Sequence, residues 1–373
     1  MLSDDVGFPR VRQTRDAAQH KQQNRRPRAR GLWGVLVLIG LAYAVFLIVY
    51  RLAEWVFNAS PGLSLPPPWS TWLALAATFE PFLLLPLVPL LLVALAMRAR
   101  AAAGLLALAG LPFVFYYAPL FLPHADAAPN GRTLKVMTHN ILAANRLGGQ
   151  PLADAILAQD ADVVALQELV ANHANLLAPR LSQAYPHRVV YPAQGLGLYS
   201  RYPLREAQLL TLAPESSFAI RAIVDAPGGA ITVFNAHPRN PRVALNTWGG
   251  SLLYVAEFDP TRRDRAVATL AQAVQRIQGP VVVLGDLNLT DRSAAYRQLT
   301  ERLRDTHRTA GWGLGYTFPV AGPGARPGFA LPILRIDYVL ATPDLQAVTC
   351  DTGPPAGSDH RPVIATLARA KAT

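Results

Sequence analysis

Eight polar side chains follow or interrupt short apolar segments in the part of the chain after residue 131. They are four carboxylates, two carboxamides and two imidazoles, namely Asn140, Glu168, His237, Asp286, Asn288, Asp337, Asp359 and His360. Singly, an Asp or Asn after a strand is usually a turn former, and a lone His is usually a structural residue. Eight such groups together are better explained by one shared cleft, because strand ends of α/β proteins direct side chains into clefts.

The composition of this set indicates the chemistry that it could perform. Oxygen ligands without thiolates suit a hard cation, Mg²⁺ or Mn²⁺, rather than zinc. Such a cation polarises a phosphoryl oxygen, a carboxylate can deprotonate the attacking water, and imidazoles can protonate or stabilise phosphate oxygens. The single cysteine, Cys350, excludes an intramolecular disulfide and a thiolate zinc site. The sequence also contains no P-loop, GxSxG or HExxH motif.

The segment Val281–Asn288 is the clearest element that would position such groups. Four apolar residues, three of them β-branched, predict a short strand buried on both faces. Gly285 ends this run just before Asp286 and Asn288. A strand that leads into an ordinary Asp/Asn turn would give the same octapeptide, so this segment alone leaves both interpretations open.

Asp337 supports a more specific prediction, because it lies inside the expected strand 335–340. A carboxylate in a buried strand is strongly unfavourable unless it is paired. We expect its partner to be an imidazole, whose tautomer the carboxylate would also fix.

Residues 132–373 alternate short apolar strands with helical segments, which predicts an α/β fold in one large domain. The expected strands are 134–138, 163–166, 188–191, 196–200, 218–224, 230–234, 281–285, 335–340 and 363–367. The expected helices are 151–159, 171–183 and 260–277.

The motifs at these strand ends resemble those of the endonuclease/exonuclease/phosphatase superfamily, in the family's order, across nearly all of residues 132–370. The most specific pair is Gly285-Asp286-Leu287-Asn288 with Ser358-Asp359-His360-Arg361-Pro362. The other matching segments are Met137–Asn140, Leu166–Glu168, Leu198–Leu204, Asn235–Pro238 and Arg335–Val339. Tyr316–Pro319 resembles the family's Thr-aromatic-Pro segment, or is a loop packing segment.

The resemblance implies a four-layer α/β sandwich, in which two face-to-face mixed β-sheets are flanked by helices. It also implies metal-dependent hydrolysis of phosphoesters. In this family pattern Glu168 would be the principal Mg²⁺ ligand, Asn140 would support it, and Asp359 would lie on the metal side.

The same resemblance assigns roles to the remaining residues. Asp286 and Asn288 would position the attacking water and the phosphate, with Asp286 as the base. His360, held by Asp337, would contact the scissile phosphate. His237 would act as a phosphate-binding acid.

Two further polar residues, Arg221 and Asn240, are candidates for contacts with the substrate phosphate. Residues 131–373 hold 24 Lys+Arg and 18 Asp+Glu, a net charge of +6 without a dense basic run. Ordinary solvated arginines are therefore favoured over a nucleic-acid stripe, although a modest attraction to phosphate-bearing substrates or anionic lipid is compatible with this charge. His139 stands where many family members carry a small or apolar residue.

Residues 1–131, which the resemblance does not cover, are typical of a membrane segment. Residues 1–31 are polar, with eight Lys+Arg and three acidic residues, and we expect a basic cytoplasmic tail. Residues 32–123 contain three apolar runs, which predict membrane helices at about 32–52, 72–97 and 101–122. Residues 124–131 would be a linker, and 132–373 the catalytic domain. A signal peptide is the alternative for the first run, but the preceding tail is long for one.

The basic residues predict the orientation. The tail and the short turn with Arg98 and Arg100 should both face the cytoplasm. Three spans then place residues 132–373 on the extracytoplasmic side of the cell (inner or plasma) membrane. Glu80 would be either an intramembrane functional group or an interfacial residue before a shorter span, 81–97.

Together these features predict a membrane-anchored Mg²⁺-dependent phosphoesterase, with Mn²⁺ as a possible replacement. Its substrate would be a phosphodiester, in nucleic acid or a lipid headgroup, or a phosphomonoester. The alternative is a catalytically inactive binding or sensor protein on the same scaffold. That alternative predicts loss of at least one of the main site residues, and none is missing. The sequence points to no protein partner.

Overall fold

The computed structural model describes residues 25–59, 69–122, 132–214, 217–248, 251–321 and 331–370. The chain forms two compact units. One consists of Met1–Ser60 and Pro81–Phe115, and the other of Pro61–Glu80 and Tyr116–Thr373.

The first unit is built from apolar helices, namely α2 (Arg25–Ala59), α4 (Leu84–Ala96) and most of α5 (Arg100–Tyr117). Side chains are buried where these helices meet, so Leu47 and Leu106 are fully enclosed. Elsewhere the surface is apolar, and Leu38 and Leu85 are 66% and 68% exposed. An apolar exterior of this kind suits lipid rather than water.

Two helical segments, Trp33–Phe57 and Arg100–Phe121, are long and apolar enough to cross a membrane. A third candidate exists only if Trp69–Thr78 and Glu80–Ala96 are counted together as one broken span. These candidates indicate a membrane protein, but the three-span segment expected from the sequence is not confirmed.

The second apolar run does not form the single helix expected at about 72–97. Helix α3 (Trp69–Thr78) ends before Phe79, and a 3-10 turn, η1 (Glu80–Leu83), precedes α4. The break follows from Glu80-Pro81, because proline lacks the backbone N–H and disfavours helical geometry in the residue before it. The tail up to residue 24 and the expected linker 124–131 lie outside the described residues.

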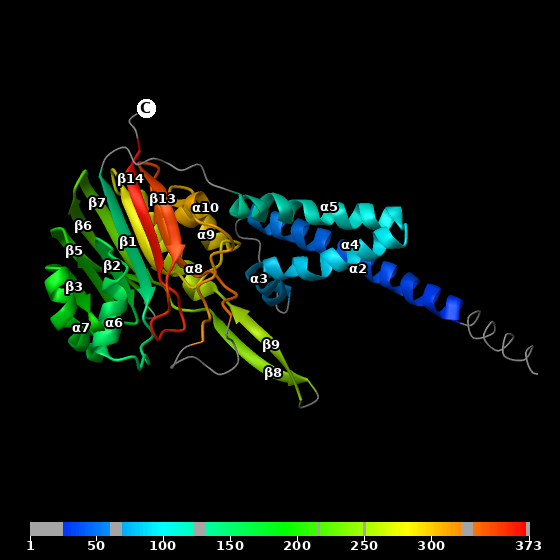
Figure 1. The fold of residues 1–373 in the computed structure, drawn as a ribbon, viewed down its shortest axis with the longest axis horizontal. Helices are drawn as coiled ribbons and strands as arrows, with labels where there is room; N and C mark the ends of the chain where they lie inside the picture. Colours follow the sequence, from blue (N-terminus) through cyan, green and yellow to red (C-terminus); the bar gives the residue numbers. More distant parts are fainter. Residues whose placement is uncertain are drawn as a thin grey trace, which may run out of the picture. The chain divides into compact units, whose positions relative to one another are not determined.

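Two six-stranded mixed sheets pack face to face in the second unit (Figure 1). The first sheet has the order β13-β14-β1-β2-β4-β3, and the second has the order β11-β12-β10-β7-β6-β5. The strands of the first sheet are β1 (Thr133–Asn140), β2 (Val163–Gln167), β3 (His187–Tyr191), β4 (Leu196–Ser200), β13 (Leu345–Thr352) and β14 (Val363–Arg369). Those of the second are β5 (Leu204–Ala213), β6 (Ser217–Ala226), β7 (Gly229–His237), β10 (Val281–Asp286), β11 (Arg304–Asp305) and β12 (Asp337–Ala341).

Alternation along the strands divides the apolar residues into an inner core and two outer cores. Val136, Val233 and Val282 are fully buried between the sheets. The outer face of each sheet packs on helices, which gives four layers and confirms the expected α/β sandwich. These helices are α6 (Gly149–Leu157) and α7 (Ala171–Ala184) on the first sheet, and α8 (Thr261–Gln275) and α9 (Ala294–Thr300) on the second.

Strand pairing brings polar groups from distant segments to one end of the sandwich. Strands β1 and β2 are parallel, as are β7 and β10, so their carboxyl ends lie together. Strand β12 runs antiparallel to β10, which places Asp337 directly opposite Asp286.

The position of Asp337 differs from the expectation. It begins β12 rather than lying inside a strand, because pairing with β10 stops at Asp286. The backbone then continues through Ile336, whose carbonyl accepts a hydrogen bond from Leu287 N–H at 2.9 Å.

A separate two-stranded ribbon, β8 (Arg242–Trp248) and β9 (Leu252–Asp259), lies between β7 and α8 in the sequence. It extends away from the sandwich, and is yellow-green in Figure 1. The sequence pattern predicts no strands in this region, so the ribbon is an unexpected feature.

Candidate active site

A cavity of about 320 Å³ lies at the end of the sandwich where these polar groups meet. It is lined by Glu168, His237, Arg239, Asn240, Asp286, Asn288, Phe318, Ile336, Asp359 and His360. Seven of these ten residues are in the predicted set. Asn140 and Asp337 do not line the cavity but are hydrogen-bonded to residues that do. Arg221 is not one of the lining residues.

Asn140 connects the two sheets beside the cavity. Its Nδ2 donates hydrogen bonds to Glu168 Oε1 and Asp286 Oδ2, both at 3.0 Å. Its Oδ1 accepts from Leu142 N–H at 3.0 Å. Because that N–H requires an oxygen acceptor, the amide orientation is fixed and the NH₂ group lies between the two carboxylates. In this geometry Asn140 positions Glu168.

Glu168 follows β2 in a left-handed conformation, with φ of 55°. A non-glycine residue in this region is strained, and such strain is common at functional sites. Its Oε2 accepts a hydrogen bond from Ala143 N–H at 2.8 Å. Burial raises the pKa of Glu168, but this hydrogen bond, the Asn140 amide and the nearby imidazoles together hold it below its usual value.

Asp286 lies at the centre of the site. Its Oδ1 accepts a hydrogen bond from Asn288 N–H at 2.9 Å. Its Oδ2 is 3.6 Å from His237 Nε2 and 3.8 Å from His360 Nε2. Burial and the neighbouring Asp337 carboxylate raise the pKa of Asp286 above its usual range.

Gly285 allows Asp286 to reach this position. It has a φ of 156°, and a Cβ at this residue would overlap the carbonyl oxygen of Ala236 on β7. Only glycine therefore permits the close approach of β10 and β7 that brings Asp286 beside His237.

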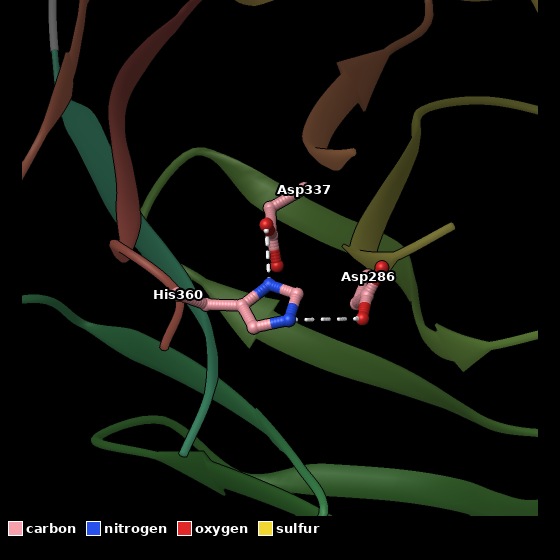
Figure 2. A group of neighbouring side chains, drawn as sticks. All are labelled: Asp286, Asp337 and His360. Carbon is pink, nitrogen blue, oxygen red and sulfur yellow. Dashed lines mark hydrogen bonds and ion pairs between the residues drawn. The ribbon is translucent and has the colours of Figure 1, made fainter. Parts of the chain in front are cut away.

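His360 is held between two carboxylates, as Figure 2 shows. Its Nδ1 is 2.9 Å from Asp337 Oδ2, so the structure places Asp337 against an imidazole, and Nε2 is directed toward Asp286. Burial lowers the pKa of His360, but Asp337 and Asp286 raise it to about 10. The Phe318 ring packs on this imidazole, with ring centroids 4.7 Å apart.

The donor set fits a divalent cation. Ligand atoms of Asp286, Asp337 and His360 lie within 4.8 Å of one another, but the His360 imidazole is held between the two carboxylates, so the carboxylates are the candidate ligands. Asp337 Oδ1 is buried without a hydrogen-bond partner among the described residues. Glu168 and Asp359 add carboxylates to the cavity wall, and burial raises the pKa of Asp359. An excess of oxygen ligands over cationic side chains is the arrangement that Mg²⁺ or Mn²⁺ requires.

His139, next to Asn140, is 1% exposed. Burial lowers its pKa to about 4, so the ring is neutral at physiological pH. Its ring nitrogens have no hydrogen-bond partner in the described part of the chain.

The two predicted substrate contacts lie in different places. Asn240 lines the cavity. On β6, Ile220 and Ala222 belong to the core between the sheets, so alternation turns Arg221 toward the outer face. Arg239, which follows His237 by two residues, also lines the cavity, although no sequence pattern predicts it.

A buried polar network behind the cavity links the sheets and was also missed. Asn235 Nδ2 donates to the carbonyls of Leu166 at 3.0 Å and Gly197 at 2.8 Å. Gln167 Nε2 donates to Asn235 Oδ1 at 2.7 Å and to Thr138 Oγ1 at 3.0 Å. These bonds hold β7 against the first sheet, and thus help to align the strands that carry the site.

Solved structures of other proteins are similar to part of this chain. D. rerio TDP2, complexed with a single strand DNA product, is 17% identical over 64% of this chain and 99% of that chain, with a TM-score of 0.51. A Beutenbergia cavernae DSM 12333 endonuclease/exonuclease/phosphatase is 24% identical over 64% of this chain and 72% of that chain, with a TM-score of 0.44. A Bacteroides vulgatus endonuclease/exonuclease/phosphatase is 20% identical over 64% and 100%, with a TM-score of 0.49.

No curated protein sequence matches the chain. The sequence profile of the Endonuclease/Exonuclease/phosphatase family matches residues 137–360, which is more than half of this chain. This range begins in β1 and ends at His360, so it contains every residue that lines the cavity. The chain therefore belongs to the endonuclease/exonuclease/phosphatase family and is a hydrolase of phosphoester bonds.

Proposed function

We propose that the chain is a membrane-anchored, Mg²⁺-dependent phosphoesterase that uses Asp286 as its base. One observation supports this most strongly. A single carboxylate oxygen, Asp286 Oδ2, lies 3.0 Å from Asn140 Nδ2, 3.6 Å from His237 Nε2 and 3.8 Å from His360 Nε2. Groups from both sheets thus surround the oxygen that would accept a proton.

Glu168 and Asp359 would hold Mg²⁺, with Asn140 fixing the Glu168 carboxylate. Mn²⁺, which takes the same oxygen ligands, should replace it. When bound, the cation neutralises charge on the phosphate oxygens.

The other side chains of the site have separate catalytic roles. Asp286 takes a proton from the attacking water, and the Asn288 backbone N–H holds its other oxygen. His360 contacts the scissile phosphate through Nε2, while Asp337 fixes its Nδ1. His237 lies beside Asp286 and donates to a phosphate oxygen.

The substrate is a phosphoester in nucleic acid, in a lipid headgroup or in a small phosphomonoester. The test is an activity panel with the full chain in detergent, covering DNA, RNA, sphingomyelin, phosphoinositides and phosphomonoesters. We expect no activity in EDTA and recovery with Mg²⁺ or Mn²⁺ on one of these classes. Activity that persists in EDTA would contradict the metal site, and no turnover on any class would favour the inactive binding protein.

We further propose that the catalytic domain is extracytoplasmic. A basic tail and an Arg98/Arg100 turn that both face the cytoplasm require the broken segment between α2 and α5 to return across the membrane. Helix α5 then leads outward to the domain. Protease added to intact spheroplasts should cleave the domain, whereas protection of the domain until lysis would invert this topology.

A further inference from the structure

The ribbon of β8 and β9 exposes an apolar surface. Residues 243–256 contain no charged residue. Val243 and Leu245 are 51% and 62% exposed, and Tyr254 is 39% exposed. Val243 lies opposite Phe258 and Leu245 opposite Val255, so these two exposed side chains share one face of the ribbon with apolar partners, whereas Tyr254 lies opposite Asn246.

A two-stranded ribbon with this composition is poorly suited to water. Isolated hairpins are marginally stable unless another layer covers their apolar face. The ribbon belongs to neither six-stranded sheet. Its exposed apolar side chains therefore indicate a surface that another phase or molecule covers.

Both ends of the ribbon are attached to the active site. Arg239 and Asn240 line the cavity, and β8 begins at Arg242. After β9, Arg263 on α8 donates to the Asn288 carbonyl at 3.0 Å. The ribbon thus connects two residues of the cavity wall with a helix that is hydrogen-bonded to a third, Asn288.

The ribbon also contacts an apolar helix of the same compact unit. Phe258 N–H donates to Thr71 Oγ1 on α3 at 3.4 Å. Helix α3 is one half of the broken candidate span, and its Trp69 and Trp72 are 65% and 53% exposed. Exposed tryptophans on an apolar helix are typical of the membrane–water interface. The apolar ribbon is therefore continuous with a segment of membrane composition.

The composition of the cavity wall argues against a nucleic acid as the molecule that binds the cavity and covers the ribbon. Within the described part of the chain, Arg239 is the one Lys or Arg that lines it. Binding to a nucleic-acid strand depends on several phosphate contacts from such side chains. An apolar ribbon beside a phosphoesterase cavity matches instead an amphiphile, with a phosphate head and an apolar body.

We propose that the β8–β9 ribbon lies in the lipid–water interface of the bilayer that anchors the chain, and that the substrate is a phosphoester in a membrane lipid headgroup. The substrate half of this proposal rests on the proposed phosphoesterase function. The position of the ribbon does not depend on catalysis and is tested separately.

The position is tested by labelling Leu245→Cys with a polarity-sensitive fluorophore in nanodiscs that hold one chain each. Native Cys350 is 1% exposed and burial raises its pKa to about 12, so the introduced thiol reacts selectively. We expect blue-shifted emission, quenched by lipids that carry a quencher near the headgroup. The control Leu176→Cys, 46% exposed on α7, should emit as in water. Water-like emission at residue 245 would overturn the proposal. A ribbon that binds a second copy of the chain would give this result, because each nanodisc holds only one copy.

The substrate class is tested by Leu245→Ser, with Leu176→Ser as the control. Hydrolysis of phospholipid in vesicles should fall about ten- to a hundredfold, the cost of losing one buried leucine. Hydrolysis of a soluble aryl phosphodiester should not change, and the control should affect neither reaction. Equal loss on both substrates, or faster cleavage of DNA than of lipid by the unaltered chain, would overturn it. Inactivity of the unaltered chain on the soluble diester would instead contradict the proposed function.

Discussion

Two groups of charged residues, each with a buried centre, differ in how their charges are balanced. The first is the active site. The second, the arginine cluster, consists of Asp291, Asp305, Arg308 and Arg335. Arg335 precedes Asp337 by two residues, and its guanidinium lies 2.6 Å from Asp305 Oδ2 and 2.9 Å from Asp291 Oδ2. Arg308 adds a second contact to Asp291 at 3.0 Å.

The arginine cluster is internally neutralised, whereas the active site is not. Two carboxylates face two guanidinium groups in the cluster. In the active site, four carboxylates share two imidazoles and one arginine at the cavity wall. Buried carboxylates without matching cations are costly, so this excess indicates a place for an external cation.

The same contrast is visible in two carboxyl groups of similar burial. Burial raises the pKa of Asp305, but the Arg335 guanidinium more than offsets this and holds the pKa below its usual range. Asp286 faces another carboxylate, and burial together with Asp337 raises its pKa. Burial alone therefore does not decide the direction of a pKa shift: a guanidinium bonded to Asp305 outweighs burial, whereas at Asp286 burial and a second carboxylate outweigh the imidazoles.

The largest expected difference between the two groups is in catalysis, which should be lost in Asp286→Asn. The amide keeps the shape but cannot take a proton from water, so turnover should fall by about 10²–10⁴. The measurement is hydrolysis of a soluble aryl phosphodiester in Mg²⁺ by the full chain. The unfolding midpoint should stay near that of the unaltered protein. A normal rate would remove Asp286 from the mechanism.

A stability effect should dominate when the arginine cluster is broken. Arg335→Leu leaves Asp305 and Asp291 without their main partner, and the free energy of unfolding should fall by about 3–5 kcal/mol. Urea unfolding in a nonionic detergent, followed by tryptophan fluorescence, measures this change. Arg304→Leu, at an exposed position on β11, is the matched control and should change stability little. If both variants unfold alike, the cluster contributes no more than a surface charge.

A smaller effect is expected in acid. Because the folded pKa of Asp305 is below its unfolded value of about 3.9, the group contributes stability above that pH. This contribution disappears as the pH falls through the folded pKa. When the pH is lowered from neutral to acidic, the free energy of unfolding should therefore decrease more in the unaltered chain than in Asp305→Asn. Parallel pH profiles would show that Asp305 is not linked to acid stability.

Most of the residues that line the cavity could be predicted because they follow strand ends in sequence. Asn140, Glu168 and Asp286 each lie at or immediately after the end of a strand, and the sheets bring such ends together. The face of Arg221 could not be predicted in the same way, because it depends on how β6 pairs and packs. Arg239 was missed because a loop residue has no periodicity that would place it.

Other features depend on contacts between distant segments. The arginine cluster joins residues 291, 305, 308 and 335, and no local pattern pairs them. The ribbon was missed because an uncharged stretch with no strict alternation fits neither a strand nor a helix. The break at Glu80 followed from Pro81, and the sequence had already allowed a shorter span from that residue.

The amide of Asn140 has a consequence for biosynthesis. It donates to Glu168 from its own sheet and to Asp286 from the other sheet, across 146 positions of sequence. Neither sheet alone contains both carboxylates, so a chain released or stalled before β10 forms cannot bring Glu168 and Asp286 together around the Asn140 amide.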